Sequence, residues 1–131
     1  MTWNELVRHV RAAGRYDDDQ ETERVLHAVL TALGGQLVGE ERRDLAAALP
    51  AKARAVLTSQ IPLTQPLDAP ALVENVAARL ATTAATARWD TSSVLTVLAD
   101  LAGNHLTGRL LAQLPPGYAL LFGRAELTTA A

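Results

Sequence analysis

Hydrophobic residues at the start of the chain recur at the spacing of an amphipathic helix. They stand at positions i, i+3, i+4 and i+7, and charged residues occupy the other faces. This first stripe consists of Trp3, Leu6, Val7 and Val10. Gly14 closes the pattern, and aspartates follow at 17–19, where carboxylates can cap the free N–H groups of a second helix. We therefore predict one helix that ends near Gly14 and another that begins after the aspartates.

Helical stripes continue through the rest of the first half. The apolar positions of the second helix are Leu26, Val29, Leu30 and Leu33. This helix should stop at Gly34-Gly35, and a short helix is expected from about Glu40 to Leu49. Pro50 then suits the first turn of another short helix, because an N–H group there has no partner in the helix to lose.

The pattern breaks between residues 59 and 70. Pro62, Pro66 and Pro70 recur every fourth residue, and proline disfavours helix in the residue before it. The segment is therefore predicted to be an extended connector. We expect it to lie against the body of the protein, because it carries several apolar side chains, which are Ile61, Leu63 and Leu67.

A second set of helical stripes follows the connector. Its first stripe is Leu72, Val73, Val76 and Leu80. Asp90 is the candidate N-cap of the next helix, which is rich in Val and Leu and should end at Gly103. A short helix is expected over 106–114, and Pro115 should open the last one, which is apolar at 120–122.

The two halves can be aligned through three anchors that occur in the same order. The anchors are a Leu-Val stripe at Leu6 and Leu72, a Gly-x4-Gly pattern at Gly34 and Gly103, and a Leu-Pro pair at 49–50 and 114–115. The register of the middle helix stays open, because two different shifts align its apolar residues. Repeats of this length that cannot bury enough surface alone pack as one body.

We therefore predict an all-α fold, a compact helical bundle made of two diverged repeats of about four helices each. One helical domain should span residues 1–131. Its parts are repeat one at 1–58, the proline-rich connector at 59–70, repeat two at 71–125 and a disordered tail at 126–131.

Composition narrows the class of protein without naming a function. Hydrophobic residues make up 49% and charged residues 20% of the 131 residues, which is typical of a globular domain. The absence of cysteine excludes disulfides, thiolate catalysis and cysteine-based metal sites. A net charge of −2 gives no overall attraction to nucleic acid or to anionic lipid, and no apolar run is long enough to span a membrane. The opening segment carries no signal peptide pattern, so we expect a cytoplasmic protein.

Charge is unevenly shared between the halves. Residues 1–60 hold 8 basic and 9 acidic side chains, whereas residues 61–131 hold 4 and 5. Two interpretations stay open for the less charged second half. It is either the more buried half or the half that carries a self-association surface.

The ends of both halves resemble a known family. Ala112-Gln113-Leu114-Pro115, followed by Tyr118, Leu121 and Phe122, is similar to the closing motif of the bacterial family known as domain of unknown function 2267. Gly14-Arg15-Tyr16-Asp17-Asp18 resembles its opening motif, and the similarity covers nearly the whole chain. It departs at Leu72 and at 81–84, where the family often has an aromatic residue and glycine. The resemblance implies a helical fold with an internal repeat and supplies no activity, cofactor or catalytic residue.

The residue types that usually carry catalysis are scattered. His9 follows Glu5 by one turn, which is typical of a surface ion pair, and His27 lacks the partners of a zinc-binding helix. His105 lies in a glycine-bounded turn. The Gly34-x4-Gly39 pattern lacks the lysine of a phosphate-binding loop. We therefore predict no catalytic residue, no cofactor and no metal site.

Partner binding is left as the leading hypothesis. Arg42 and Arg43 are flanked by acidic residues, so nucleic acid is not an expected partner. Trp3 and Trp89 fit core positions, but an exposed Trp89 beside Arg88 would indicate an interface. The candidate interface residues are Trp89, Tyr118 and Phe122.

The expected function is a non-enzymatic protein–protein or self-association module, with an unknown protein or a second copy as its partner. The alternative is a bundle that binds a small ligand or lipid in a groove between the repeats. An enzyme ranks third. A continuous apolar cavity of about 300 Å³ or more would favour the ligand-binding alternative.

Overall fold

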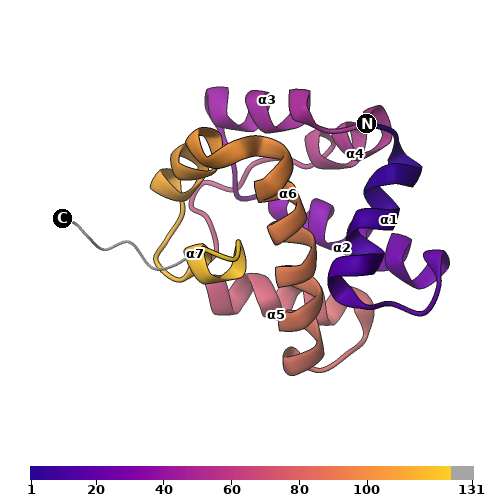
Figure 1. The fold of residues 1–131 in the computed structure, drawn as a ribbon. Coiled ribbons are helices and arrows are strands. Elements are labelled where there is room, and N and C mark those ends of the chain that lie inside the picture. The colour runs from indigo at the N-terminus through magenta and orange to yellow at the C-terminus, as the bar shows by residue number, and fades with distance from the viewer. Residues whose placement is uncertain (125–131) are drawn as a thin grey trace.

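The computed structural model describes residues 1–124, and every regular element in that range is a helix (Figure 1). The helices are α1 (Trp3–Gly14), α2 (Asp19–Gly34), α3 (Gly39–Ala48), α4 (Ala51–Thr58), α5 (Ala69–Leu80), α6 (Ala84–Gln113) and α7 (Tyr118–Leu121). The predicted all-α fold class is confirmed. The predicted disordered tail at 126–131 lies outside the described residues.

Most helix starts are capped by the side chains that the sequence offers. Thr2 and Glu5 form a capping box at α1, and the Asp18 carboxylate accepts from the Glu21 N–H at 2.8 Å at the start of α2. Asp68 caps α5 in the same way, 2.9 Å from the Ala71 N–H. The predicted role of the acidic triplet as a helix start is therefore confirmed.

The predicted cap at Asp90 is wrong. Helix α6 begins at Ala84, where the Thr83 side chain accepts from the Thr86 N–H at 3.2 Å. The residues in between include three alanines, the strongest helix former, and Ala87 is fully buried and extends the apolar stripe toward the N-terminus. Asp90 is consequently an internal residue of the helix, and its side chain is buried.

Helix α6 is the central element of the fold. It runs through the middle of the molecule, with α1 and α2 on one side and α7 on the other (Figure 1). Gly103 interrupts it with φ 85° and ψ 164°, a conformation that a residue with a side chain rarely adopts. The predicted stop at Gly103 is thus present as a kink, after which a second helical segment continues to Gln113.

The two halves form a common core. Helix α1 of the first half packs on α6 of the second, and α5 of the second half packs on α2 of the first. Leucine and valine side chains fill the space between them. The largest fully buried side chains are Tyr118, Phe122, Leu6, Leu26, Leu30, Leu33, Leu37, Leu45, Leu57, Leu72, Leu95 and Leu98. Neither half therefore buries its apolar stripes without the other.

Corresponding helix ends have matching backbone conformations. Arg15 after α1 and Ala81 after α5 both adopt left-handed conformations, with φ of 56° and 52°. Leu49 after α3 and Leu114 after α6 are both extended, at φ −99° ψ 152° and φ −102° ψ 152°. These pairs support the predicted duplication, which stays a prediction.

The glycine anchor of that alignment does not match the structure. Gly39 begins α3 with φ 70°, whereas its predicted counterpart Gly108 lies inside the second segment of α6. Gly34 ends α2 without a positive φ, whereas its predicted counterpart Gly103 has φ 85°. Glycines at equal spacing therefore differ in backbone conformation and in position along the helices between the two halves.

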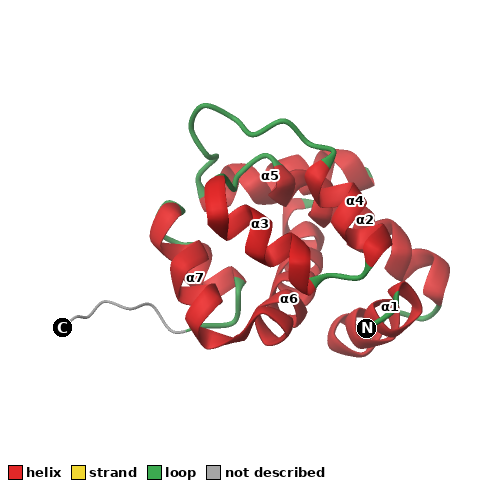
Figure 2. Cartoon of the chain, turned by 90° about the horizontal axis from the view of Figure 1, so that it is seen from above, coloured by secondary structure: helices red, strands yellow, loops and turns green. Residues whose placement is uncertain are grey.

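The connector between α4 and α5 arches along the outside of the helices (Figure 2). Backbone hydrogen bonds attach it to the body: the Leu63 N–H donates to the Gly35 carbonyl at 2.9 Å, and the Leu67 N–H donates to the buried Gln36 side chain at 2.6 Å. Ile61 is 86% exposed. The segment is attached to the body as predicted. The attachment is made by these two hydrogen bonds, and the expected packing of Ile61 is absent.

Candidate functional site

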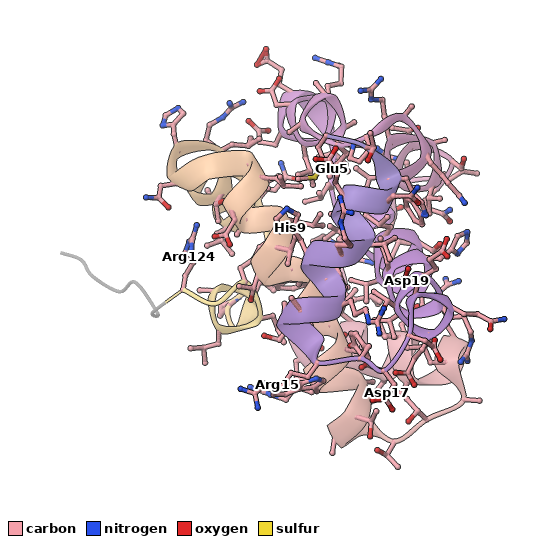
Figure 3. All side chains as sticks on the ribbon, turned by 45° about the vertical axis from the view of Figure 1, so that its right-hand side comes forward. Glu5, His9, Arg15, Asp17, Asp19 and Arg124 are labelled. Atoms are coloured by element: carbon pink, nitrogen blue, oxygen red, sulfur yellow. The ribbon has the colours of Figure 1, made fainter. Side chains whose placement is uncertain are left out.

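The three histidines considered as catalysts lie on three different helices. His9 lies on α1, one turn from Glu5 (Figure 3), His27 lies on α2, and His105 follows the kink of α6. All three are exposed. Within residues 1–124 no group of three or more His, Asp or Glu side chains is placed to hold a metal ion. The structure thus places each histidine on a different helix, outside any such group of metal-ligating side chains in the described residues.

Trp89 is the predicted interface residue that reaches the surface. Its side chain is 52% exposed, and its indole N–H donates to the Gly14 carbonyl at 3.0 Å. That bond joins α6 to the end of α1. Arg15 and Asp17 lie on the turn that follows (Figure 3). Trp89 therefore links the two halves through a hydrogen bond and also presents an exposed aromatic surface.

Tyr118 and Phe122 are fully buried, so their side chains are not available to a partner. The Tyr118 hydroxyl donates to the Leu67 carbonyl at 2.7 Å, and burial raises the pKa of this phenol. A phenol that bonds to the connector and a phenyl ring in the core together fix the short helix α7 on the molecule. These two residues hold α7 in place, but they do not contribute to its exposed surface.

A buried phenol–carboxyl pair lies beside Trp89. The Tyr16 hydroxyl donates to Asp90 Oδ1 at 2.6 Å, and Asp90 is only 4% exposed. Burial raises the pKa of Asp90, and the hydrogen bond from Tyr16 offsets part of that rise. The Tyr16 pKa is raised by burial and by the same hydrogen bond. Sequence reasoning missed this pair, because the two residues stand 74 positions apart.

A shallow pocket of about 300 Å³ opens next to this pair. It is lined by Tyr16, Glu21, Arg24, Val25, Leu80, Thr82, Thr86, Trp89 and Asp90. The phenol and the carboxyl face each other in its wall, where each satisfies the other. The Tyr16–Asp90 contact is therefore a structural hydrogen bond at the rim of a pocket.

An apolar depression lies on the second half. This α5–α6–α7 groove has a volume of about 470 Å³. Its lining consists of Ala69, Pro70, Val73, Glu74, Ala84, Ala85, Arg88, Gly117, Leu120 and Leu121. Leu120 is 55% exposed, whereas Tyr118 and Leu121 on the same short helix are buried. The groove therefore presents an apolar surface on a rigid frame.

Two charges of opposite sign lie on the lining of the groove. Glu74 comes from α5 and Arg88 from α6, and both are exposed. Neither takes part in the ion pairs formed within residues 1–124. Two features of the sequence bear on this surface: the low charge of the second half, for which burial and self-association both stayed open, and the apolar run at 120–122. The sequence could not show that residues 69–74, 84–88 and 117–121 meet.

The described helices include none whose length and apolar character would let it cross a membrane. The fold and its groove define the class: a small all-α bundle whose two halves share one core and whose second half carries an apolar groove. A comparison with protein-family models matches residues 3–121 to the family described as "Uncharacterized conserved protein (DUF2267)". The chain belongs to this family, as its opening and closing motifs indicated. No curated protein matches the chain.

Proposed function

We propose that the protein is a self-association module that pairs with a second copy of itself through the α5–α6–α7 groove. The observation that carries the proposal is the exposed Leu120 beside an apolar depression of about 470 Å³. Apolar patches on the surface of a soluble protein can mark sites of association. The low charge of the second half supports the same choice.

The charges on the groove favour a second copy as the occupant. In a twofold dimer the same patch meets itself, so each group on one copy faces the symmetry-related groups of the other. Glu74 and Arg88 have opposite signs and line the same groove. Glu74 of one copy can therefore pair with Arg88 of the other, twice per dimer, which sets the orientation of the two copies.

Leu120 supplies the apolar part of the contact. Burying the exposed half of a leucine side chain is worth about 1 kcal/mol, and a twofold dimer counts it twice. A stable interface needs about 1,200 Å² of buried surface or more, so the neighbouring faces of α5 and α7 join the contact. The rigid attachment of α7 through Tyr118 and Phe122 lowers the ordering cost of that contact.

The proposed role involves no catalytic step and no cofactor, and its proposed place is the bacterial cytoplasm. The lack of cysteine fits a reducing compartment, where disulfides are rare. The second candidate is a ligand-binding bundle. The groove volume falls within the range of small-molecule sites, about 300–1,000 Å³, which favours that alternative.

Sedimentation velocity over a hundredfold range of concentration tests the proposal. The wild type should convert from monomer to dimer, and Leu120→Glu should remain a monomer at every concentration. Ile61→Glu is the matched control, because it makes the same change at a side chain that is 86% exposed on the connector. It should dimerise like the wild type.

Charge exchange tests the orientation. Glu74→Arg and Arg88→Glu should each weaken the dimer, and the double variant should recover it, because the pair is then restored with signs reversed. A wild type that stays monomeric throughout, or an Ile61→Glu variant as impaired as Leu120→Glu, would contradict self-association. A monomer that binds an apolar fluorescent dye, and loses that binding in Leu120→Glu, would favour the ligand-binding candidate.

A further inference from the structure

A second pocket lies where α2 of the first half packs on α5 of the second. Its volume is about 420 Å³. The lining residues are Arg24, His27, Ala28, Thr31, Arg79 and Leu80. Two arginines and a histidine thus line one depression, and no carboxylate is among its lining residues. This inference does not depend on the proposed self-association.

The arginines of this α2–α5 pocket are available to a ligand. Arg24 and Arg79 are both exposed and take part in none of the ion pairs within residues 1–124. The Arg79 Nε donates to the Asn75 side chain at 2.7 Å, which orients the guanidinium and leaves its terminal nitrogens free of that bond. In a chain with a net charge of −2, a pocket whose charged lining residues are both arginines is a local exception.

Thr31 adds an independent observation. Its Oγ1 is buried and has no hydrogen-bond partner within the described residues. A buried hydroxyl without a partner costs free energy, and helical threonine divides between two χ1 rotamers. Thr31 is also a lining residue of the pocket, so its unpartnered hydroxyl belongs to a side chain that borders the place where a ligand would bind.

We propose that the α2–α5 pocket binds a phosphate monoester. Guanidinium groups match phosphate oxygens with two parallel hydrogen bonds, and Arg24 and Arg79 approach from two different helices. The His27 ring and the Thr31 hydroxyl supply further polar contacts, and Ala28 and Leu80 provide an apolar floor for the organic part of the ester. Because α2 and α5 belong to different halves, a bound phosphate bridges the two halves.

The pocket is contiguous with the one beside Trp89, since Arg24 and Leu80 line both. An ester with an aromatic group can therefore keep its phosphate at Arg24 and lay its ring toward the half-exposed indole. Phenyl phosphate is accordingly expected to bind several-fold more tightly than inorganic phosphate. A phosphate monoester also occurs as the headgroup of phosphatidic acid, so free and membrane-borne forms of this chemistry need separate measurements.

NMR titration of the full chain with inorganic phosphate and with phenyl phosphate tests the proposal, with chloride adjusted to constant ionic strength. Saturable shifts should be confined to α2, α5 and Trp89. Arg24→Gln and Arg79→Gln should each weaken binding by about tenfold, as expected for the loss of one charge-assisted contact. Arg8→Gln is the matched control, because it removes the same charge from an exposed position on α1 outside the pocket.

Two further measurements separate the ligand sources and the role of Thr31. Thr31→Val keeps the shape of the side chain and should weaken phosphate binding by a smaller factor than either arginine variant. Co-sedimentation with phosphatidylcholine vesicles, with and without phosphatidic acid, shows whether the membrane-borne form is also bound through the same arginines. Shifts that do not saturate, or an Arg8→Gln variant that weakens binding as much as Arg79→Gln, would overturn the proposal.

Discussion

The Tyr16 hydroxyl donates a hydrogen bond to Asp90 Oδ1 at 2.6 Å, although the two residues are 74 positions apart in the chain. Tyr16 lies on the turn after α1, and Asp90 lies inside α6. The neighbouring Trp89 indole donates to the Gly14 carbonyl at 3.0 Å, so two successive residues of α6 hold the same turn. These two hydrogen bonds link the halves through polar groups beside a core that is mostly apolar.

Tyr16→Phe should destabilise the protein more at neutral than at acidic pH. The variant leaves the Asp90 carboxylate buried without its donor, and such a loss costs about 1–3 kcal/mol. Burial already raises the pKa of Asp90, and the Tyr16 bond lowers it, so the variant should raise that pKa further. Urea unfolding of wild type and variant at a series of pH values between 4 and 8 measures the effect.

The sign of the pH dependence follows from the raised pKa. The folded state keeps the Asp90 proton to a higher pH than the unfolded chain does, so stability from this group falls as the pH rises through the folded pKa. Asp90→Asn keeps an acceptor for Tyr16 and removes that fall. Asp100→Asn is the control on the same helix, because Asp100 is exposed. Equal pH profiles for the two asparagine variants would contradict the assignment to Asp90.

The helices were predictable from the sequence because their signals are local. The stripe from Trp3 to Val10, the cap at Asp18 and the stop at Gly103 depend on neighbours within a few residues, and all three are present. Asp90 was misassigned for the same reason. An aspartate before an apolar run has the local signature of a cap, and its burial against Tyr16 depends on a residue in the other half.

The groove was only partly predictable. The low charge of the second half left two interpretations open, a more buried half or a self-association surface, and the apolar run at 120–122 fits either one. Which of its residues are exposed depends on how α7 is rotated. Buried Tyr118 and Phe122 turn Leu120 outward, although all three are apolar or aromatic and close together in sequence. A four-residue helix has too little periodicity to show which face it buries.

The glycines at 34 and 108 should respond to alanine in opposite directions. A Cβ on Gly34 would lie 2.4 Å from the Leu57 carbonyl oxygen, so α2 and α4 must move apart, and such overpacking costs about 1–3 kcal/mol. A Cβ on Gly108 meets nothing within 4 Å and the residue is helical and exposed. Gly108→Ala should therefore stabilise the protein by about 0.5–1 kcal/mol.

Thermal unfolding of the two variants measures this difference. Gly103→Ala serves as a comparison: it has equally open surroundings but a φ of 85°, so it should destabilise through backbone strain alone. A stabilised Gly103→Ala, or two variants at 34 and 108 that shift the midpoint in the same direction, would show that the backbone at these turns differs from the one described.

Arg109 should contribute a stability that salt removes. Its guanidinium bonds to Glu41 Oε2 at 2.8 Å and to Asp44 Oδ2 at 3.0 Å, which ties α3 to the second segment of α6. The hydrogen bond from Arg109 holds the pKa of Glu41 below its usual range. The stabilisation from Glu41 is therefore present above the ordinary glutamate pKa and is lost as the pH falls through the lowered value.

Arg109→Gln should lower the thermal midpoint in dilute buffer and raise the Glu41 pKa toward the ordinary glutamate range, as followed by carboxyl NMR titration. Because all three side chains are partly exposed, the wild type and the variant should converge as the salt concentration rises to 1 M, where the screening length is about 3 Å. Arg43→Gln is the matched control, because it removes an exposed arginine from α3 that takes part in none of the ion pairs within residues 1–124. If the difference between Arg109→Gln and wild type persisted in 1 M salt, the role of Arg109 would be packing of its aliphatic stem and not the ion pairs.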